Sequence, residues 1–451
     1  MPENRAHRLA AKDKRYVWHP FTQMKDWLAD PEPLVIRRGE KATLFDSDGN
    51  PYLDGVSSLW VTVHGHGHPR LAKALADQMR LLDHSTLLGL ANEPSIELAE
   101  ALVGAAPRGL TKVFYSDSGS TAMEIALKIA FQYWQNLGGA SQKKRSFITL
   151  TESYHGDTLG SVSLGGIELF HEVYRPLLFK TLQVRTPYGR GDKSEGERAL
   201  AEISELLRRR ADSVAGVVLE PLMQGAAGML KAPAGFLKAV RALCDRHDVL
   251  LICDEVATGF GRTGRLFACE HEKVRPDLMA VAKGLTGGVL PLAATLATER
   301  VYRGFLHPYA DKKTFFHGHT YTGNPLACAV AVENLKLFRA ERTLERLAPK
   351  IERLTKGLGA LLERPHVAEI RQVGFMVGIE LMRDKASRRP YGYAEAVGAR
   401  VCRRARDYGV ILRPLGDVLV LMPPLCTSPT ELDFLLKVVS ASVRDVTESK
   451  A

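Results

Sequence analysis

The chain has 451 residues, of which 45% are hydrophobic and 25% are charged. This composition is typical of soluble globular proteins and excludes disordered and fibrous classes, while the length predicts more than one domain. The 61 Lys and Arg residues outweigh the 51 Asp and Glu residues by +10, but the excess is spread along helix-like stretches beside acids, so we expect no nucleic-acid partner.

Segments for export, membrane insertion or disulfide formation are not apparent. The longest apolar run, residues 284–298, falls short of the roughly 18 residues that a membrane helix needs. The first 18 residues contain Glu3 and Asp13 and lack the apolar centre of a secretory signal. The six cysteines are scattered without a C-x-x-C pair, which is typical of reduced thiols. We therefore expect a cytoplasmic protein that does not bind membranes.

Taken in chain order, the predicted elements begin with short polar strands around the turn at residues 47–50. From about residue 58, apolar or β-branched runs alternate with helical patterns, which predicts βαβ units and a mainly parallel sheet covered on both faces. The predicted strands are 113–116, 147–151, 214–220, 249–254, 278–282 and 293–298, and the main helices are 121–137, 195–210 and 235–247. After residue 340 we expect two charged helices, a strand near 378–381, another helix and a strand near 418–422.

This order predicts an α/β fold with two domains. The large domain would span residues 58–340 and hold the mainly parallel sheet. A smaller α+β domain would be assembled from both ends of the chain, residues 1–57 and 341–451. We find no internal repeat.

Two glycine-containing motifs are weak functional signals. His64, His66 and His68 alternate with glycines, as in a metal site, but no carboxylate pair or cysteine completes a ligand set, so we expect a structural loop and no metal. Gly259 to Gly264 match G-x-G-x-x-G, but four residues separate the motif from the preceding strand and no long helix follows it. A nicotinamide dehydrogenase is therefore a minor alternative.

The segment Ser116-Asp-Ser-Gly-Ser120 follows a strand and precedes a helix. Free backbone N–H groups at a helix N-terminus, a glycine and hydroxyl donors suit a phosphate group. An ordinary N-cap explains the same residues, since Ser and Asp favour that position. The segment alone leaves both interpretations open.

Asp254 and Lys283 stand at the ends of two consecutive predicted strands. The carboxyl ends of strands in open α/β sheets are where ligands bind, although a solvated strand end is an alternative for Asp254. A lysine at such a position among small residues is a candidate Schiff-base former. A phosphate cradle, a lysine and a carboxylate for the pyridine nitrogen are what pyridoxal phosphate needs, and Tyr154, after the strand 147–151, could stack on its ring.

With these residues in view, the chain resembles the class III, fold-type I pyridoxal-phosphate aminotransferases over nearly its whole length. Within them it is most similar to the biotin-biosynthesis branch. The motifs that carry the resemblance are Trp18-His-Pro-Phe-Thr-Gln-Met24, Asp54-Gly-Val-Ser-Ser-Leu-Trp60, Tyr154-His-Gly-Asp157, the segment from Asp254 to Gly264, His317-Gly-His-Thr320, Arg413-Pro-Leu-Gly416 and Met422-Pro-Pro424.

The resemblance implies a role for each matching residue. Lys283 would form the Schiff base, Asp254 would hold the pyridine nitrogen, and Tyr154 would stack on the ring. Gly119 and Ser120 would hold the phosphate, together with His319 and Thr320 from the neighbouring subunit of a homodimer. Arg413 would bind the carboxylate of the keto substrate. Leu59, Trp60, Tyr154 and Gly318 would line its channel, with core packing as the alternative for Trp60.

The implied reaction moves an amino group to 8-amino-7-oxononanoate, with S-adenosylmethionine as the expected donor and lysine as the alternative. Some family members have tyrosine in place of Phe21, a tryptophan pair in place of Leu59 and Trp60, and proline in place of His319. Because Phe21 lacks a hydroxyl, any hydrogen bond from that position is lost, which leaves the donor open. An ω-aminotransferase acting on ornithine, 4-aminobutyrate or β-alanine is the alternative within the same fold.

Overall fold

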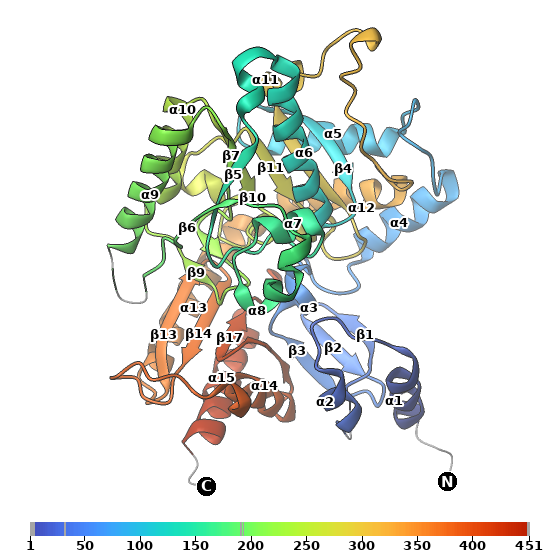
Figure 1. The fold of residues 1–451 in the computed structure, drawn as a ribbon. Helices are drawn as coiled ribbons and strands as arrows, with labels where there is room; N and C mark the ends of the chain where they lie inside the picture. The colour runs from blue at the N-terminus through green and yellow to red at the C-terminus, as the bar shows by residue number, and fades with distance from the viewer. Residues whose placement is uncertain (1–4, 31–32, 190–191, 193, 449–451) are drawn as a thin grey trace.

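The computed structural model describes residues 5–30, 33–189, 192 and 194–448 (Figure 1). Its centre is a seven-stranded sheet in the order β4-β12-β11-β10-β7-β5-β6. Every pair is parallel except the two that β12 makes with β4 and β11, so the predicted mainly parallel α/β sheet is confirmed. The strands are β4 (Leu110–Ser116), β5 (Ser146–Leu150), β6 (Leu182–Val184), β7 (Val214–Leu219), β10 (Leu250–Asp254), β11 (Leu278–Val281) and β12 (Ala293–Thr298).

Helices cover both faces of this sheet (Figure 1). In β10, Leu250 and Ile252 pack into the cluster that contains α6 (Gly119–Leu137), whereas Leu251 and Cys253 pack into the cluster on the other face. Successive side chains of a strand point to opposite faces, so a strand buried on both sides must be apolar throughout. The helices that contribute to this other cluster include α5 (Glu93–Ala105), α9 (Glu195–Arg210), α10 (Phe236–Arg246) and α12 (Pro325–Ala340).

Two smaller sheets lie at one end of the central sheet, near both termini (Figure 1). The first has the order β1-β2-β3-β15, in which β15 (Val410–Ile411) runs parallel to β3 (Pro51–Asp54) and joins the two ends of the chain. It also contains β1 (Ile36–Glu40) and β2 (Thr43–Asp46). The second has the order β13-β14-β17-β16. The domain boundaries near residues 57 and 340 stay a prediction, and residues 1–4 and 449–451 lie outside the described residues.

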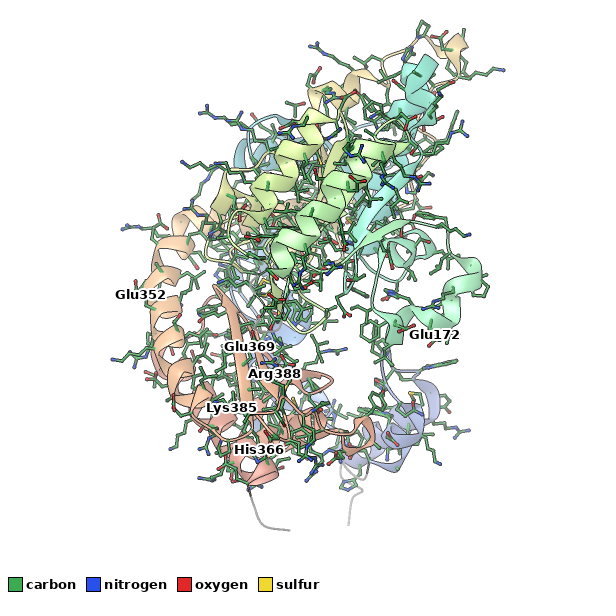
Figure 2. All side chains as sticks on the ribbon, turned by 60° about the vertical axis from the view of Figure 1, so that its left-hand side comes forward. Glu172, Glu352, His366, Glu369, Lys385 and Arg388 are labelled. Atoms are coloured by element: carbon green, nitrogen blue, oxygen red, sulfur yellow. The ribbon has the colours of Figure 1, made fainter. Side chains whose placement is uncertain are left out.

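One prediction about the C-terminal part is wrong. Instead of two charged helices between residues 340 and 378, one helix, α13 (Thr343–Leu362), is followed by the strand β13 (Val367–Val373), which pairs with β14 (Met376–Leu381). The charged residues of β13 have partners in other segments: Arg371 is 4% exposed and pairs with Glu380 of β14 across the sheet. Glu369 lies beside Arg388, with 3.5 Å between Oε2 and Nη2 (Figure 2). Such tertiary pairing is invisible in a local charge pattern.

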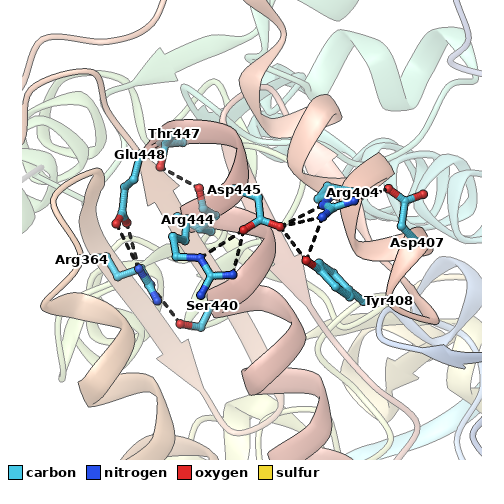
Figure 3. A network of polar contacts seen from close by, with 10 residues as sticks. Arg364, Arg404, Asp407, Tyr408, Ser440, Arg444, Asp445, Thr447 and Glu448 are labelled. Atoms are coloured by element: carbon cyan, nitrogen blue, oxygen red, sulfur yellow. Dashed lines mark hydrogen bonds and ion pairs between the residues drawn. The ribbon is translucent and has the colours of Figure 1, made fainter. Parts of the chain in front are cut away.

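The last helix, α15 (Pro429–Thr447), is held by polar contacts (Figure 3). Its Asp445 accepts hydrogen bonds from Tyr408 (2.6 Å) and Arg404 (2.9 Å), next to the C-terminal end of α14 (Val397–Asp407). These bonds, with those from Arg444, hold the pKa of Asp445 well below its usual value. The other strands of this region are β16 (Arg413–Leu415) and β17 (Val418–Leu421).

Candidate active site

A cavity of about 710 Å³ opens at the carboxyl ends of the parallel strands. Asp254 ends β10, Lys283 comes two residues after β11, and Glu220 comes directly after β7. Tyr154 follows β5. The first turn of α6, which comes shortly after the end of β4, forms another part of the wall. The fold therefore brings together residues that are far apart in the sequence, because parallel strands present their ends at one edge.

At one end of the cavity lies the N-terminus of α6, with Gly119 and Ser120 in its first turn. Ser118 is the N-cap and accepts a hydrogen bond from the backbone N–H of Thr121, so the N-cap interpretation applies to Ser118. Gly119 meets the side chain of Val256 so closely that a Cβ atom there would lie 2.5 Å from Val256 Cγ1. The first N–H groups of a helix have no intrahelical partner, so this turn can still bind an anion.

Asp254 is 5% exposed and lies 2.7 Å from Nδ1 of His155, measured from its Oδ2 atom. Its other oxygen accepts the backbone N–H of Val256 at 3.0 Å. Burial disfavours a charged imidazole, but the hydrogen bond and the negative charge of Asp254 outweigh it and raise the pKa of His155 above its ordinary value. This pair fixes the orientation of a buried carboxylate that lines the cavity.

Lys283 is half-buried, and desolvation lowers the pKa of its amine because a charged ammonium loses hydration. Its Nζ lies 5.4 Å from the centre of the Trp60 ring. A lysine held closer to its neutral form is a better nucleophile toward a carbonyl group.

Trp60 both lines the cavity and belongs to a buried cluster with four methionines, so the binding and core-packing interpretations apply together. Its indole N–H is buried without a hydrogen-bond partner among the described residues. The turn before it is strained: Ser57, Ser58 and Trp60 have φ of 50°, 59° and 64°. Asp54 supports this turn by accepting hydrogen bonds from the Ser58 backbone (2.8 Å) and hydroxyl (3.0 Å). Strain of this kind persists only where surrounding contacts maintain it.

Tyr154 lines the cavity and donates a hydrogen bond from its hydroxyl to Asp157 at 2.8 Å. Burial, that hydrogen bond and the charge of Asp157 raise its pKa. Arg413 is not among the lining residues, but it lies near enough for its charge to act on Tyr154. Its guanidinium makes no hydrogen bond or ion pair with any residue that the structure describes, and burial lowers its pKa.

Four further predicted residues do not line the cavity. Leu59 is 47% exposed, Gly318 and Thr320 are exposed, and Nε2 of His319 lies 3.9 Å from an oxygen of Asp117. The reach of Gly318, His319 and Thr320 into a partner subunit stays a prediction.

The two weak motifs have structural explanations. Residues 259–264 form turns, and the element after them is the short 3-10 helix η3 (Ala268–Glu272) rather than an α-helix, so the dinucleotide geometry is not formed. His66 lies 2.9 Å from Asp54, and His68 lies 3.1 Å from Glu341. Within the described ranges, no group of three or more His, Cys, Asp or Glu side chains could hold a metal ion.

Sequence reasoning gave no role to two buried ionisable residues of the cavity, His155 and Glu220. His155 follows Tyr154 within a motif already recognised. Glu220 was predicted as the end of the strand 214–220, and the argument applied to Asp254, a carboxylate at the carboxyl end of an apolar strand, could have identified it. Its burial pushes its pKa up to about 7.

Comparisons with known proteins are consistent with this geometry. A family model described as aminotransferase class-III matches residues 27–443. An adenosylmethionine-8-amino-7-oxononanoate aminotransferase from Geobacter sulfurreducens is 51% identical over 99% of this chain and 100% of its own length. The one from Methanocaldococcus jannaschii has a crystal structure with 43% identity and a TM-score of 0.94, covering 97% of this chain and 99% of that one. A sixfold mutant of an omega transaminase from Pseudomonas jessenii has 32% identity and a TM-score of 0.93, covering 98% and 99%.

Proposed function

This chain belongs to the class-III aminotransferase family, and we propose that it transfers an amino group to 8-amino-7-oxononanoate, giving 7,8-diaminononanoate in biotin biosynthesis. The observation that carries the proposal is the cavity in which Lys283, Asp254 and the first turn of α6 converge. The relatives that share half of its residues over nearly the full length bear the name of that activity. An ω-aminotransferase of other substrate range is the alternative, but the omega transaminase compared above shares only 32%.

The residues of the cavity fit pyridoxal 5'-phosphate. Gly119 and Ser120 offer an anion site at a helix N-terminus, Lys283 offers an amine that faces the cavity with a lowered pKa, and Asp254 offers a buried carboxylate. We assign these four residues to cofactor binding, with Tyr154 against the ring. Once bound, the cofactor would supply an aldehyde for amines and a ring that withdraws electrons from the carbon being deprotonated.

The chain's own residues would then perform three tasks. Asp254, oriented by His155, keeps a proton on the nitrogen atom that faces it. Lys283 Nζ takes up and returns a proton at the reacting carbon, which its lowered pKa favours at neutral pH. Trp60 covers Lys283 and excludes water from this side of the cavity.

We also propose a cytoplasmic homodimer with shared active sites. In this arrangement His319 and Thr320 of one subunit reach the phosphate site of the other, and Gly318 with Leu59 and Trp60 forms the substrate channel. The loop that carries residues 318–320 has exposed aromatic side chains, with Phe316 79% and Tyr321 63% exposed. Such exposure is expected for a surface that a second subunit covers. No helix that the structure describes is long and apolar enough to cross a membrane.

The amino donor is tested by a single turnover. Holoenzyme is mixed with S-adenosylmethionine or with lysine, and conversion to the pyridoxamine form is followed by absorbance before 8-amino-7-oxononanoate is added. We expect conversion by S-adenosylmethionine, because Trp60 and Phe21 could stack on its adenine ring. Conversion by lysine alone would change the donor but keep the reaction class. Conversion by either donor without transfer to the ketone would contradict the proposed acceptor.

Arg413→Ala is expected to raise KM for the keto substrate about 100-fold, on the scale of losing the partner of a carboxylate, with little change in the donor half-reaction. Arg413 has no partner within the described chain, so its guanidinium is free for a ligand. Half-reaction rates measured separately provide the test, with Arg400→Ala, an exposed arginine on α14, as the control. Equal losses in both half-reactions would show that the role of Arg413 is not specific to binding the keto substrate.

A further inference from the structure

Glu220 is the carboxylate of the cavity to which the reaction above gives no task. It comes directly after β7, is 8% exposed and lines the same cavity as Lys283. Its Oε1 accepts the backbone N–H of Tyr154 at 3.1 Å, and its Oε2 accepts that of Gly225 at 2.8 Å. Among the described residues no cation forms an ion pair with it.

The position of Glu220 is defined by its neighbours. A Cβ atom on Gly225 would lie 3.4 Å from Cζ3 of Trp60 and 3.7 Å from Oε2 of Glu220, so the indole and the carboxylate border the same small space. The Trp60 ring in turn lies 5.4 Å from Lys283 Nζ. The negative charge of Glu220 also acts on Lys283. Glu220 therefore stands beside the place where the chemistry occurs.

Three other carboxylates line the cavity, and each is accounted for. Asp254 is bonded to His155. Asp157 is exposed and accepts the Tyr154 hydroxyl. Asp117 is exposed and accepts the hydroxyl of Thr121. Glu220 alone is buried with only backbone donors.

A buried carboxylate without an ion-pair partner is costly to ionise, and burial raises its pKa to about 7, which the charge of His155 offsets only in part. Two backbone N–H groups hold its orientation but do not supply a charge. A cationic ligand group would offset the desolvation and favour the ionised form, provided that it can reach the oxygens. The adjoining face of Trp60 would favour the same kind of ligand, since an aromatic ring attracts a cation.

We propose that Glu220 binds the ammonium group that the keto substrate carries on the carbon next to its reacting carbonyl. This inference rests on the proposed function, because 8-amino-7-oxononanoate has its amino group at that position. Glu220, which is bonded to the backbone of Tyr154, and Arg413, whose charge acts on the Tyr154 hydroxyl, would then bind the two ends of a zwitterion. Glu220 is thus a specificity-determining residue that selects α-amino ketones over simple ketones.

The test compares two acceptors, 8-amino-7-oxononanoate and 7-oxononanoate, which lacks the amino group. With holoenzyme in the pyridoxamine form, wild type should show kcat/KM about 100-fold higher for the amino ketone, as expected for a buried charge pair. Glu220→Gln, which has nearly the same shape, should reduce this preference to less than about tenfold, mainly by raising KM for the amino ketone. Glu220→Asp keeps the charge and should retain part of the preference.

Glu197→Gln serves as the matched control, since Glu197 is an exposed glutamate of α9 outside the cavity. A preference that survives in Glu220→Gln, or that falls equally in Glu197→Gln, would overturn the assignment. If Glu220→Gln does not fold, wild type still decides, because equal use of both ketones is incompatible with an ammonium site. Use of both ketones without a preference would refute the role of Glu220 alone, whereas use of neither would refute the proposed function and this inference with it.

Discussion

Replacing Lys283 with alanine is expected to lower kcat/KM by at least about 10³-fold, because one amine both binds the cofactor covalently and moves the proton. Among the described residues that line the cavity, Lys283 is the one lysine, so no second amine is placed to replace it. Borohydride reduction of wild-type holoenzyme, followed by peptide mapping, should place the cofactor on the peptide that contains Lys283. In Lys283→Ala the reduced cofactor should be released on denaturation.

The matched control is Lys238→Ala, which removes an exposed lysine from α10 and should keep both activity and labelling. Circular dichroism and the unfolding midpoint show whether Lys283→Ala keeps the fold. Labelling of a different lysine in wild type would refute the assignment, whatever the activity of the variant.

Asp254→Asn is expected to lower kcat about 100-fold or more while the cofactor stays bound, on the scale at which one preorganised polar group supports a transition state. Asparagine has almost the same shape, so its carbonyl oxygen can still accept the Val256 N–H. It lacks the negative charge that keeps a proton on the facing ring nitrogen. The same exchange also weakens the 2.7 Å contact with His155.

The measurement separates cofactor content, read from absorbance and phosphate analysis, from kcat in saturating substrates. Asp212→Asn, at an exposed turn before β7, is the control for the chemical change itself. Near-normal turnover in Asp254→Asn would show that Asp254 is a structural strand end. Loss of the cofactor together with the fold would instead show that the Asp254–His155 pair serves stability.

The central sheet and its strand ends could be predicted from the sequence because their signals are local. Strand β12 and helix α9 have the predicted bounds, residues 293–298 and 195–210, since an apolar run or a 3.6-residue pattern identifies each element without its neighbours. Asp254 and Lys283 were found because parallel strands place their carboxyl ends at one edge. The motifs around them then identified the family.

What only the tertiary structure decided is which side chains meet. The bond between His155 and Asp254 joins residues 99 positions apart, and the lone carboxylate of Glu220 is recognisable only from the burial around it. The charged pattern of β13 led to the prediction of a helix, but in the structure Arg371 pairs with Glu380 of β14 and Glu369 lies beside Arg388 in a turn after β14. Local patterns define elements through the geometry of the backbone, whereas desolvation and charge pairing depend on neighbours that the fold alone brings within reach.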